Sequence, residues 1–258
     1  MRDKLEDKVA IITGAGTGIG QAVAIAYARE GAHIVGIGRR VEKLQETARE
    51  VEQSGRRFLA VGCDVTKKED CENAARMTLG GFGKIDILVS NAAISPVTPF
   101  LEITPEEWDE VLAINLKGSV LMSQAVLPHM IERKKGKIIM VNSSQSRRSP
   151  AAYVQNHYVA AKMGMMGLTR CLAAEFGPVG IQVNAFAPGY TPETELAMKY
   201  WAPVITPEYE KQSVSIIPLR RYAGVEDYQG VAVFLASEGS DYITGQTISV
   251  DGGATMVG

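Results

Sequence analysis

A tyrosine and a lysine stand four residues apart in the stretch HYVAAK, at Tyr158 and Lys162. On an α-helix this spacing places both side chains on one face, so that they can reach a common point. A phenol can give a proton to an oxygen atom or take one from it, and a nearby ammonium changes how readily it does so. The pair is therefore a candidate for acid–base chemistry. The alternative is a surface pair without function.

A glycine-rich turn, TGAGTGIG, occupies residues 13–20 after the apolar run KVAIIT. Gly14, Gly18 and Gly20 allow the backbone to turn sharply and to approach a ligand closely, and free amide groups at the start of a following helix favour a phosphate. The spacing is TG-x-x-x-G-x-G and departs from the strict G-x-G-x-x-G. Its position between a buried strand and a helix favours a dinucleotide site over a simple turn.

The second apolar run ends in GIGRR, with Gly38 where an NAD enzyme usually carries an acid for the ribose 2′-hydroxyl. Arg39 and Arg40 follow it. Guanidinium groups bind phosphate in a bidentate manner, whereas an acid would repel a 2′-phosphate. The sequence therefore predicts NADP(H) rather than NAD(H), with Arg39 as the main determinant. Two simply solvated arginines are the alternative.

Short apolar runs, largely β-branched, alternate with helical patterns along the chain. The runs lie at 8–13, 33–37, 57–61, 85–90, 137–142, 181–186 and 247–250, and the helices are expected at 18–30, from Val41 until Gly55, and at 67–80, 104–131, 152–177 and 225–236. This alternation predicts a single Rossmann-like α/β domain over residues 1–258, with a doubly wound parallel sheet of about seven strands and helices on both faces. The irregular stretch 189–222 is a candidate substrate lid.

Composition excludes several classes of function. The net charge of −2 gives no reason to expect nucleic-acid or membrane binding. Three cysteines without C-x-x-C spacing fit a reducing compartment, and no apolar run near the N-terminus resembles a signal peptide, so we expect a cytoplasmic protein. The three histidines lack metal-ligand spacing, and no metal is expected.

Together, several motifs resemble those of the short-chain dehydrogenase/reductase family. They are TGAGTGIG at 13–20, CDV at 63–65, SNAA at 90–93, Asn115, NSS at 142–144, Y-x-x-x-K at 158–162 and PG at 188–189. They occur in the family's order and roughly at its spacing, and they cover nearly the whole chain. The Y-x-x-x-K pair alone is a weak signal, but its combination with the glycine turn and a preceding serine is specific.

The resemblance implies a role for each matching position. Tyr158 would be the general acid or base, Ser143 would orient the substrate oxygen, and Lys162 would hold the nicotinamide ribose and, with the cationic oxidised ring, lower the pKa of Tyr158. Asn115 would anchor a water path to the lysine, although a helix-surface asparagine is the rival interpretation. The implied cofactor contacts are Gly14, Thr17, Gly18, Ile19, Gly20, Arg39, Arg40, Asp64, Val65, Asn91, Ala92, Ala93, Tyr158, Lys162, Pro188, Gly189 and Thr191.

Some positions depart from the family pattern. Ala93 stands in the place of a glycine. The catalytic serine could be Ser143 or Ser144, with counting along the strand favouring Ser143, and the contact to the nicotinamide amide could come from Thr191 or Thr194.

The substrate is expected to be a polar ketone or secondary alcohol, similar to a sugar or polyol. We expect Ser143, Gln145, Tyr158 and Tyr190 to contact it, with Arg147, Arg148 and Trp201 nearby. His157 is expected on the helix surface. A 3-oxoacyl-type ketoreductase is the alternative enzyme, and a catalytically silent NADP(H)-binding regulatory protein is the alternative of another class. The resemblance also implies a homotetramer or homodimer.

Overall fold

The computed structural model describes residues 3–146 and 155–256, and these residues form one seven-stranded parallel sheet. The spatial order is β3-β2-β1-β4-β5-β6-β7. The strands are β1 (Val9–Thr13), β2 (His33–Gly38), β3 (Phe58–Gly62), β4 (Ile87–Ser90), β5 (Gly136–Val141), β6 (Ile181–Pro188) and β7 (Thr247–Val250). The predicted Rossmann-like fold is confirmed.

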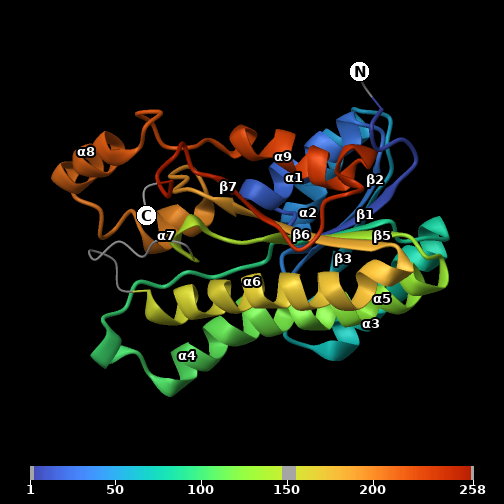
Figure 1. Cartoon of the computed structure of the whole chain (residues 1–258), viewed down its shortest axis with the longest axis horizontal. Helices are drawn as coiled ribbons and strands as arrows, with labels where there is room; N and C mark the ends of the chain where they lie inside the picture. Colours follow the sequence, from blue (N-terminus) through green and yellow to red (C-terminus); the bar gives the residue numbers. More distant parts are fainter. Residues whose placement is uncertain (1–2, 147–154, 257–258) are drawn as a thin grey trace.

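Helices cover both faces of the sheet (Figure 1). One face carries α1 (Gly18–Arg29), α2 (Val41–Glu52) and α9 (Gln229–Ala236), and the other carries α3 (Lys68–Phe82), α4 (Pro105–Leu112), α5 (Gly118–Glu132) and α6 (Asn156–Phe176). All side chains of β1 and β5 are buried, because parallel strands covered on both sides bury both parities of their residues. The first residues of the helix expected over 152–177 lie outside the described part of the chain.

The helix expected over 104–131 consists of three consecutive pieces. α4 begins after Thr104, whose hydroxyl accepts a hydrogen bond from the amide of Glu107. Residues 113–117 form a π-helical turn, and α5 continues from Gly118. By length and composition the stretch Pro105–Glu132 could cross a membrane, but 44% of its most apolar window is buried within the protein. Its apolar side chains, such as Met122, pack in the core between helix and sheet.

The candidate lid at 189–222 is more regular than expected. It contains two helices, α7 (Glu195–Tyr200) and α8 (Pro207–Ile216), which lie beyond one end of the sheet (Figure 1). Thr194 and Thr206 each accept a hydrogen bond from a backbone amide three residues later and so cap these helices. The sequence TPE at 206–208 repeats the start of α4 and could have predicted α8.

The strand order changes direction next to β1, which pairs with β2 on one side and with β4 on the other. Ligands of open α/β sheets bind in the crevice at such a point, outside the carboxyl ends of the strands. The glycine turn follows β1 and the segment SNAA follows β4. The fold therefore brings two of the predicted motifs to one crevice.

Candidate active site

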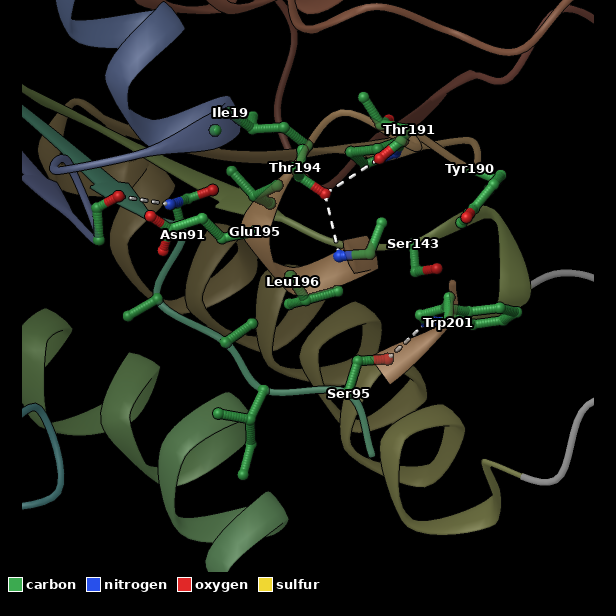
Figure 2. A pocket seen from close by; sticks show the side chains of 18 of the residues that line it. Ile19, Asn91, Ser95, Ser143, Tyr190, Thr191, Thr194, Glu195, Leu196 and Trp201 are labelled. Atoms are coloured by element: carbon green, nitrogen blue, oxygen red, sulfur yellow. Dashed lines mark hydrogen bonds between the residues drawn. The ribbon is translucent and has the colours of Figure 1, made fainter. Parts of the chain in front are cut away.

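A cavity of about 840 Å³ lies at the carboxyl ends of the strands and extends below the lid (Figure 2). It brings together most of the predicted residues. Those that line it are Gly14, Thr17, Gly18, Ile19, Arg39, Arg40, Asp64, Val65, Asn91, Ala92, Ala93, Ser143, Gln145, Tyr158, Lys162, Pro188, Gly189, Tyr190 and Thr191. Gly20 and Asn115 do not line it, and both lie behind its wall.

The glycine turn needs its glycines for two different reasons. Gly14 and Gly18 have φ angles of 66° and 57°, in the left-handed region that residues with a Cβ rarely adopt. Gly20 is required by space, because a Cβ there would lie 2.3 Å from the carbonyl oxygen of Gly14. The turn therefore presents backbone to the cavity, as a phosphate site requires.

Asn91 fixes this turn from the neighbouring strand. Its side-chain Nδ2 donates to the carbonyl oxygens of Thr13 and Gly14, at 2.9 and 3.3 Å. The Thr13 hydroxyl in turn accepts from the amides of Asn91 and Ala92, at 2.8 and 2.9 Å. The segments after β1 and β4 are thus tied together, and Ala93 lines the cavity although it replaces a glycine.

The cavity lining also contains an arginine and an aspartate, Arg39 and Asp64. Arg39 is exposed and makes no hydrogen bond or ion pair within the described residues, although its charge acts on Asp64. Burial raises the pKa of Asp64, but hydrogen bonds from Thr66 and the charge of Arg39 outweigh it, so the net pKa is lowered. The carboxylate therefore stays ionised, and the Arg39 guanidinium remains available to an anion.

Arg40 has a different environment from Arg39. Its guanidinium donates to the carboxylate of Glu195, at the start of lid helix α7, at a distance of 2.5 Å. Next to Glu195, the Thr194 methyl group would lie 3.3 Å from a Cβ placed on Gly18. The lid helix therefore lies directly over the glycine turn. The sequence analysis missed Glu195, since no local pattern shows that residue 195 meets residue 40.

The proton-transfer candidates lie together in the lining of the cavity. The Gln145 amide donates to Ser143 Oγ at 3.2 Å, and the Ser143 side chain lies close enough to Tyr158 to act on the pKa of its phenol. Of the two candidate serines, Ser143 is therefore the one placed against Tyr158. Figure 2 shows the Ser143 side chain in the cavity, near Tyr190.

Burial dominates the electrostatics of Tyr158 and Lys162. It raises the pKa of Tyr158 to about 12, with the hydrogen bond from Ser143 acting in the opposite direction. It lowers the pKa of Lys162 to about 7. The Lys162 Nζ donates to the Val141 carbonyl at 2.8 Å and lies 5.7 Å from the centre of the Tyr158 ring. In the protein by itself, burial therefore raises the pKa of Tyr158. The sequence expectation included the charge of the oxidised nicotinamide and stays a prediction.

Asn115 is fully buried in the π-helical turn, so the rival interpretation as a helix-surface residue is wrong. Its side chain accepts from the Ile94 amide at 2.9 Å and donates to the Ile94 carbonyl at 2.8 Å. This double contact holds the segment that follows β4 against the helices. Both ends of the Asn115 side chain are therefore engaged with protein.

The two candidate threonines both line the cavity. The Thr191 hydroxyl lies 2.6 Å from the Tyr228 hydroxyl, and Thr194 caps α7 while donating to the Thr191 carbonyl (Figure 2). Each therefore has a structural role in holding the lid. Pro188 and Gly189, which precede them, lie at the end of β6.

His157 is completely buried, and the expectation of a helix-surface position is wrong. Its Nδ1 accepts from the Tyr158 amide at 2.9 Å, so the ring proton is on Nε2, which donates to Glu107 Oε1 at 2.8 Å. Burial raises the pKa of Glu107, but hydrogen bonds from Thr98 and His157 outweigh it and the net pKa is lowered. An ionised carboxylate on α4 therefore fixes the residue that precedes Tyr158.

We expect His157 to be a positioning residue for Tyr158. His157→Ala should lower kcat about ten-fold and cost roughly 1–3 kcal/mol of stability, because the buried Tyr158 amide loses its acceptor. His157→Asn should recover most of kcat, since the asparagine Oδ1 can accept from the same amide. Steady-state kinetics with thermal melts measure both. Wild-type kcat in His157→Ala, or equal loss in both variants, would contradict this role.

Sequence reasoning also missed the buried serine that follows the SNAA segment. Ser95 lines the cavity and accepts hydrogen bonds from Gln155 Nε2 at 2.6 Å and Trp201 Nε1 at 3.4 Å (Figure 2). Trp201 and Tyr190 both line the cavity and pack with ring centroids 5.6 Å apart. Arg147 and Arg148 lie outside the described residues.

Comparisons with known proteins agree with this geometry. A family model described as Enoyl-(Acyl carrier protein) reductase matches residues 14–255. The chain is 39% identical to 2-dehydro-3-deoxy-D-gluconate 5-dehydrogenase of Escherichia coli over 96% of each chain, and 38% identical to Dehydrogenase/reductase SDR family member 4 of Sus scrofa over 98% of this chain and 88% of the relative.

A solved structure from Beutenbergia cavernae, assigned as an NAD(P)-dependent gluconate 5-dehydrogenase and containing NADP at low occupancy, is 36% identical with a TM-score of 0.89 and covers 98% of both chains. The relatives are oxidoreductases that act on alcohol or carbonyl groups. The chain matches them over nearly its whole length, with the motifs gathered in one cavity. It therefore belongs to the short-chain dehydrogenase/reductase family and is an NAD(P)-dependent oxidoreductase acting on CH–OH or C=O groups.

Proposed function

We propose that this protein is an NADP(H)-dependent carbonyl reductase or alcohol dehydrogenase, acting on a polar substrate similar to a sugar or polyol. The observation that carries the proposal is the placement of Ser143, Tyr158 and Lys162 in one cavity with the glycine turn, where Ser143 acts on the pKa of the Tyr158 phenol. When bound, the nicotinamide supplies or accepts a hydride. The residues described below would bind it and handle the proton.

Tyr158 would give its phenol proton to the carbonyl oxygen during reduction and take it back during oxidation. A phenol with a pKa of about 12 is protonated at neutral pH, which suits the role of acid. Ser143 would hold the substrate oxygen, because its own hydroxyl is fixed by the Gln145 amide. Lys162, held by the Val141 carbonyl, would bind the nicotinamide ribose. Asn115 would anchor a water path to Lys162.

The protein's residues fit a dinucleotide. The left-handed φ angles of Gly14 and Gly18 expose backbone for the pyrophosphate, with Thr17, Ile19 and Gly20 completing the turn. Asp64 and Val65 would meet the adenine, Asn91 to Ala93 would pass behind it, and Pro188, Gly189 and Thr191 would lie at the nicotinamide. Arg39 makes no hydrogen bond or ion pair within the described residues, so its guanidinium could bind the 2′-phosphate of NADP(H). The Beutenbergia cavernae structure contains NADP.

Glu195 should weaken NADP(H) binding slightly, because its carboxylate competes with a 2′-phosphate for Arg40. We expect Glu195→Gln to tighten NADPH binding about two- to five-fold, since an exposed ion pair contributes at most about 1 kcal/mol, and to leave NADH binding unchanged. Fluorescence titration measures both constants. Glu193→Gln is the matched control from the same loop. Equal effects of Glu195→Gln on both cofactors would disprove the competition.

The polar lining near Ser143 supports a hydroxylated substrate. Gln145, Tyr190, Gln212 and Ser213 all line this cavity. Gln145 Oε1 is buried without a hydrogen-bond partner, which leaves an acceptor that a substrate hydroxyl could satisfy. Relatives that act on a deoxygluconate and on gluconate are named for hydroxylated substrates.

NADPH consumption with a panel of ketoses, simple ketones and β-ketoacyl esters tests the proposal. Turnover of ketoses above the others supports it, whereas preferred turnover of β-ketoacyl esters would favour a 3-oxoacyl-type ketoreductase, a class related to the acyl-carrier-protein description of the matching family model. Tight NADPH binding without any turnover would favour the regulatory protein.

We also propose a cytoplasmic protein that forms a homotetramer or homodimer and binds neither nucleic acid nor membrane. Sedimentation velocity at micromolar concentration tests the assembly, and a monomer there would contradict it. The two buried thiols, Cys63 and Cys71, are free, which is compatible with a reducing compartment.

A further inference from the structure

Unpaired polar atoms gather around the proposed reaction centre. Among the described residues, three buried side-chain atoms have no hydrogen-bond partner, and they belong to Asn142, Gln145 and Gln155. Asn142 and Gln145 flank Ser143, and Gln155 precedes Tyr158 by three residues. A buried polar group without a hydrogen-bond partner costs free energy, so such a cluster needs an explanation. A polar group of a bound ligand would supply the missing partners.

The orientation of the Gln155 amide is fixed by its neighbours. Its Nε2 donates to the Ser95 carbonyl at 2.9 Å and lies 3.4 Å from the Pro96 carbonyl. Exchanging nitrogen and oxygen would place Oε1 against these two carbonyl oxygens, which repel it. Nε2 therefore also donates to Ser95 Oγ, at 2.6 Å, and Oε1 is the atom without a partner.

The Ser95 hydroxyl consequently has a proton to give. Its oxygen accepts from Gln155 and from Trp201, and neither of these nitrogens can take the serine proton. No described residue accepts it, while Ser95 is 1% exposed and lines the cavity that contains Ser143. The unused donor is the Ser95 hydroxyl, and the unused acceptor is Gln155 Oε1. They lie close together, because the nitrogen of the same Gln155 amide donates to the Ser95 oxygen.

We propose that Ser95, which lines the cavity, and Gln155, which is buried directly behind Ser95, form a subsite for a second, uncharged hydroxyl group of the substrate; this rests on the function proposed above. A hydroxyl accepts the Ser95 proton and donates its own proton to Gln155 Oε1, so that both groups are satisfied. A carboxylate could accept from Ser95 but has no proton for the Gln155 oxygen, and two acceptors repel each other. The subsite therefore selects a hydroxyl group over a carboxylate at this position.

Three four-carbon ketones with NADPH test the subsite: erythrulose, butan-2-one and 2-oxobutanoate. We expect the wild type to favour erythrulose over both others. Ser95→Ala should lower the ratio of kcat/KM for erythrulose to that for butan-2-one about ten-fold, because one hydrogen-bond donor to the substrate is lost. Ser95→Thr, which keeps the hydroxyl, should retain the ratio. Ser123→Ala, another 1% exposed serine but on α5, should leave it unchanged.

An unchanged ratio in folded, active Ser95→Ala would overturn the subsite and leave the proposed function intact. A wild-type preference for 2-oxobutanoate would overturn the subsite and the proposed sugar- or polyol-like substrate, while the reductase activity would stand. Calorimetric binding of threitol to the NADPH complex provides a readout that needs no turnover. Weaker threitol binding in Ser95→Ala than in Ser123→Ala supports the subsite, and equal binding rejects it. If the wild type reduces none of the three ketones while Ser95→Ala still weakens threitol binding, the proposed reductase activity fails and the hydroxyl subsite stands.

Discussion

Tyr158→Phe should lower kcat by about two to four orders of magnitude, while NADPH binding changes little. The substitution removes only the hydroxyl that would exchange a proton with the substrate oxygen, and positioned general acids typically contribute a factor of this size. The Ser143 hydroxyl would lose its partner but would still be held by the Gln145 amide. Steady-state kinetics in both directions, together with a fluorescence titration of NADPH, measure the effect.

Tyr242→Phe is the matched control for this experiment, because Tyr242 is fully exposed and is not among the residues that line the cavity. It should retain wild-type turnover. A Tyr158→Phe variant that binds NADPH and turns over at the wild-type rate would show that the phenol does not take part in the reaction. A loss of both turnover and NADPH binding would indicate a disrupted site instead.

Arg39→Ala should weaken NADPH binding about ten- to a hundred-fold and leave NADH binding within about two-fold, because a guanidinium–phosphate contact is charge-assisted and bidentate whereas NADH lacks the phosphate. Arg39 is the arginine that makes no hydrogen bond or ion pair within the described residues, whereas Arg40 is bound to Glu195. Kd values from fluorescence titration at one ionic strength give the two effects.

The exposed Arg49 on α2 lies outside the cavity lining and provides a charge-matched control. Arg49→Ala should change neither constant, since a general loss of one positive charge acts weakly through solvent. If Arg39→Ala and Arg49→Ala weaken NADPH binding equally, only net charge is involved. Comparable wild-type affinity for NADPH and NADH would defeat the cofactor preference directly.

Local sequence patterns determined the fold and the outline of the site. Alternating apolar runs and helical periodicities are short-range signals, and they placed all seven strands close to their observed positions. The glycine turn was readable because positive φ angles at Gly14 and Gly18 demand glycine. Since parallel strands direct their carboxyl ends to one edge, the motifs after β1, β4 and β5 had to meet there.

Tertiary structure decided the environment of each side chain. His157 is buried because α4 brings Glu107 across the start of α6, fifty residues away in sequence. Asn115 is buried because a π-helical turn directs its side chain at Ile94. The hydrophobic periodicity of the sequence does not predict such a turn.

The same holds for the charges and for the lid. Burial raises the pKa of Tyr158 in the protein by itself, and no local pattern in the sequence shows that burial. The pairs Arg40–Glu195 and Ser95–Gln155 join residues 155 and 60 positions apart. The sequence by itself therefore determined which elements form and which chemical groups reach the crevice. Only the folded chain decided which of those groups are paired, which are buried and which remain free for a ligand, because these properties depend on contacts between distant segments.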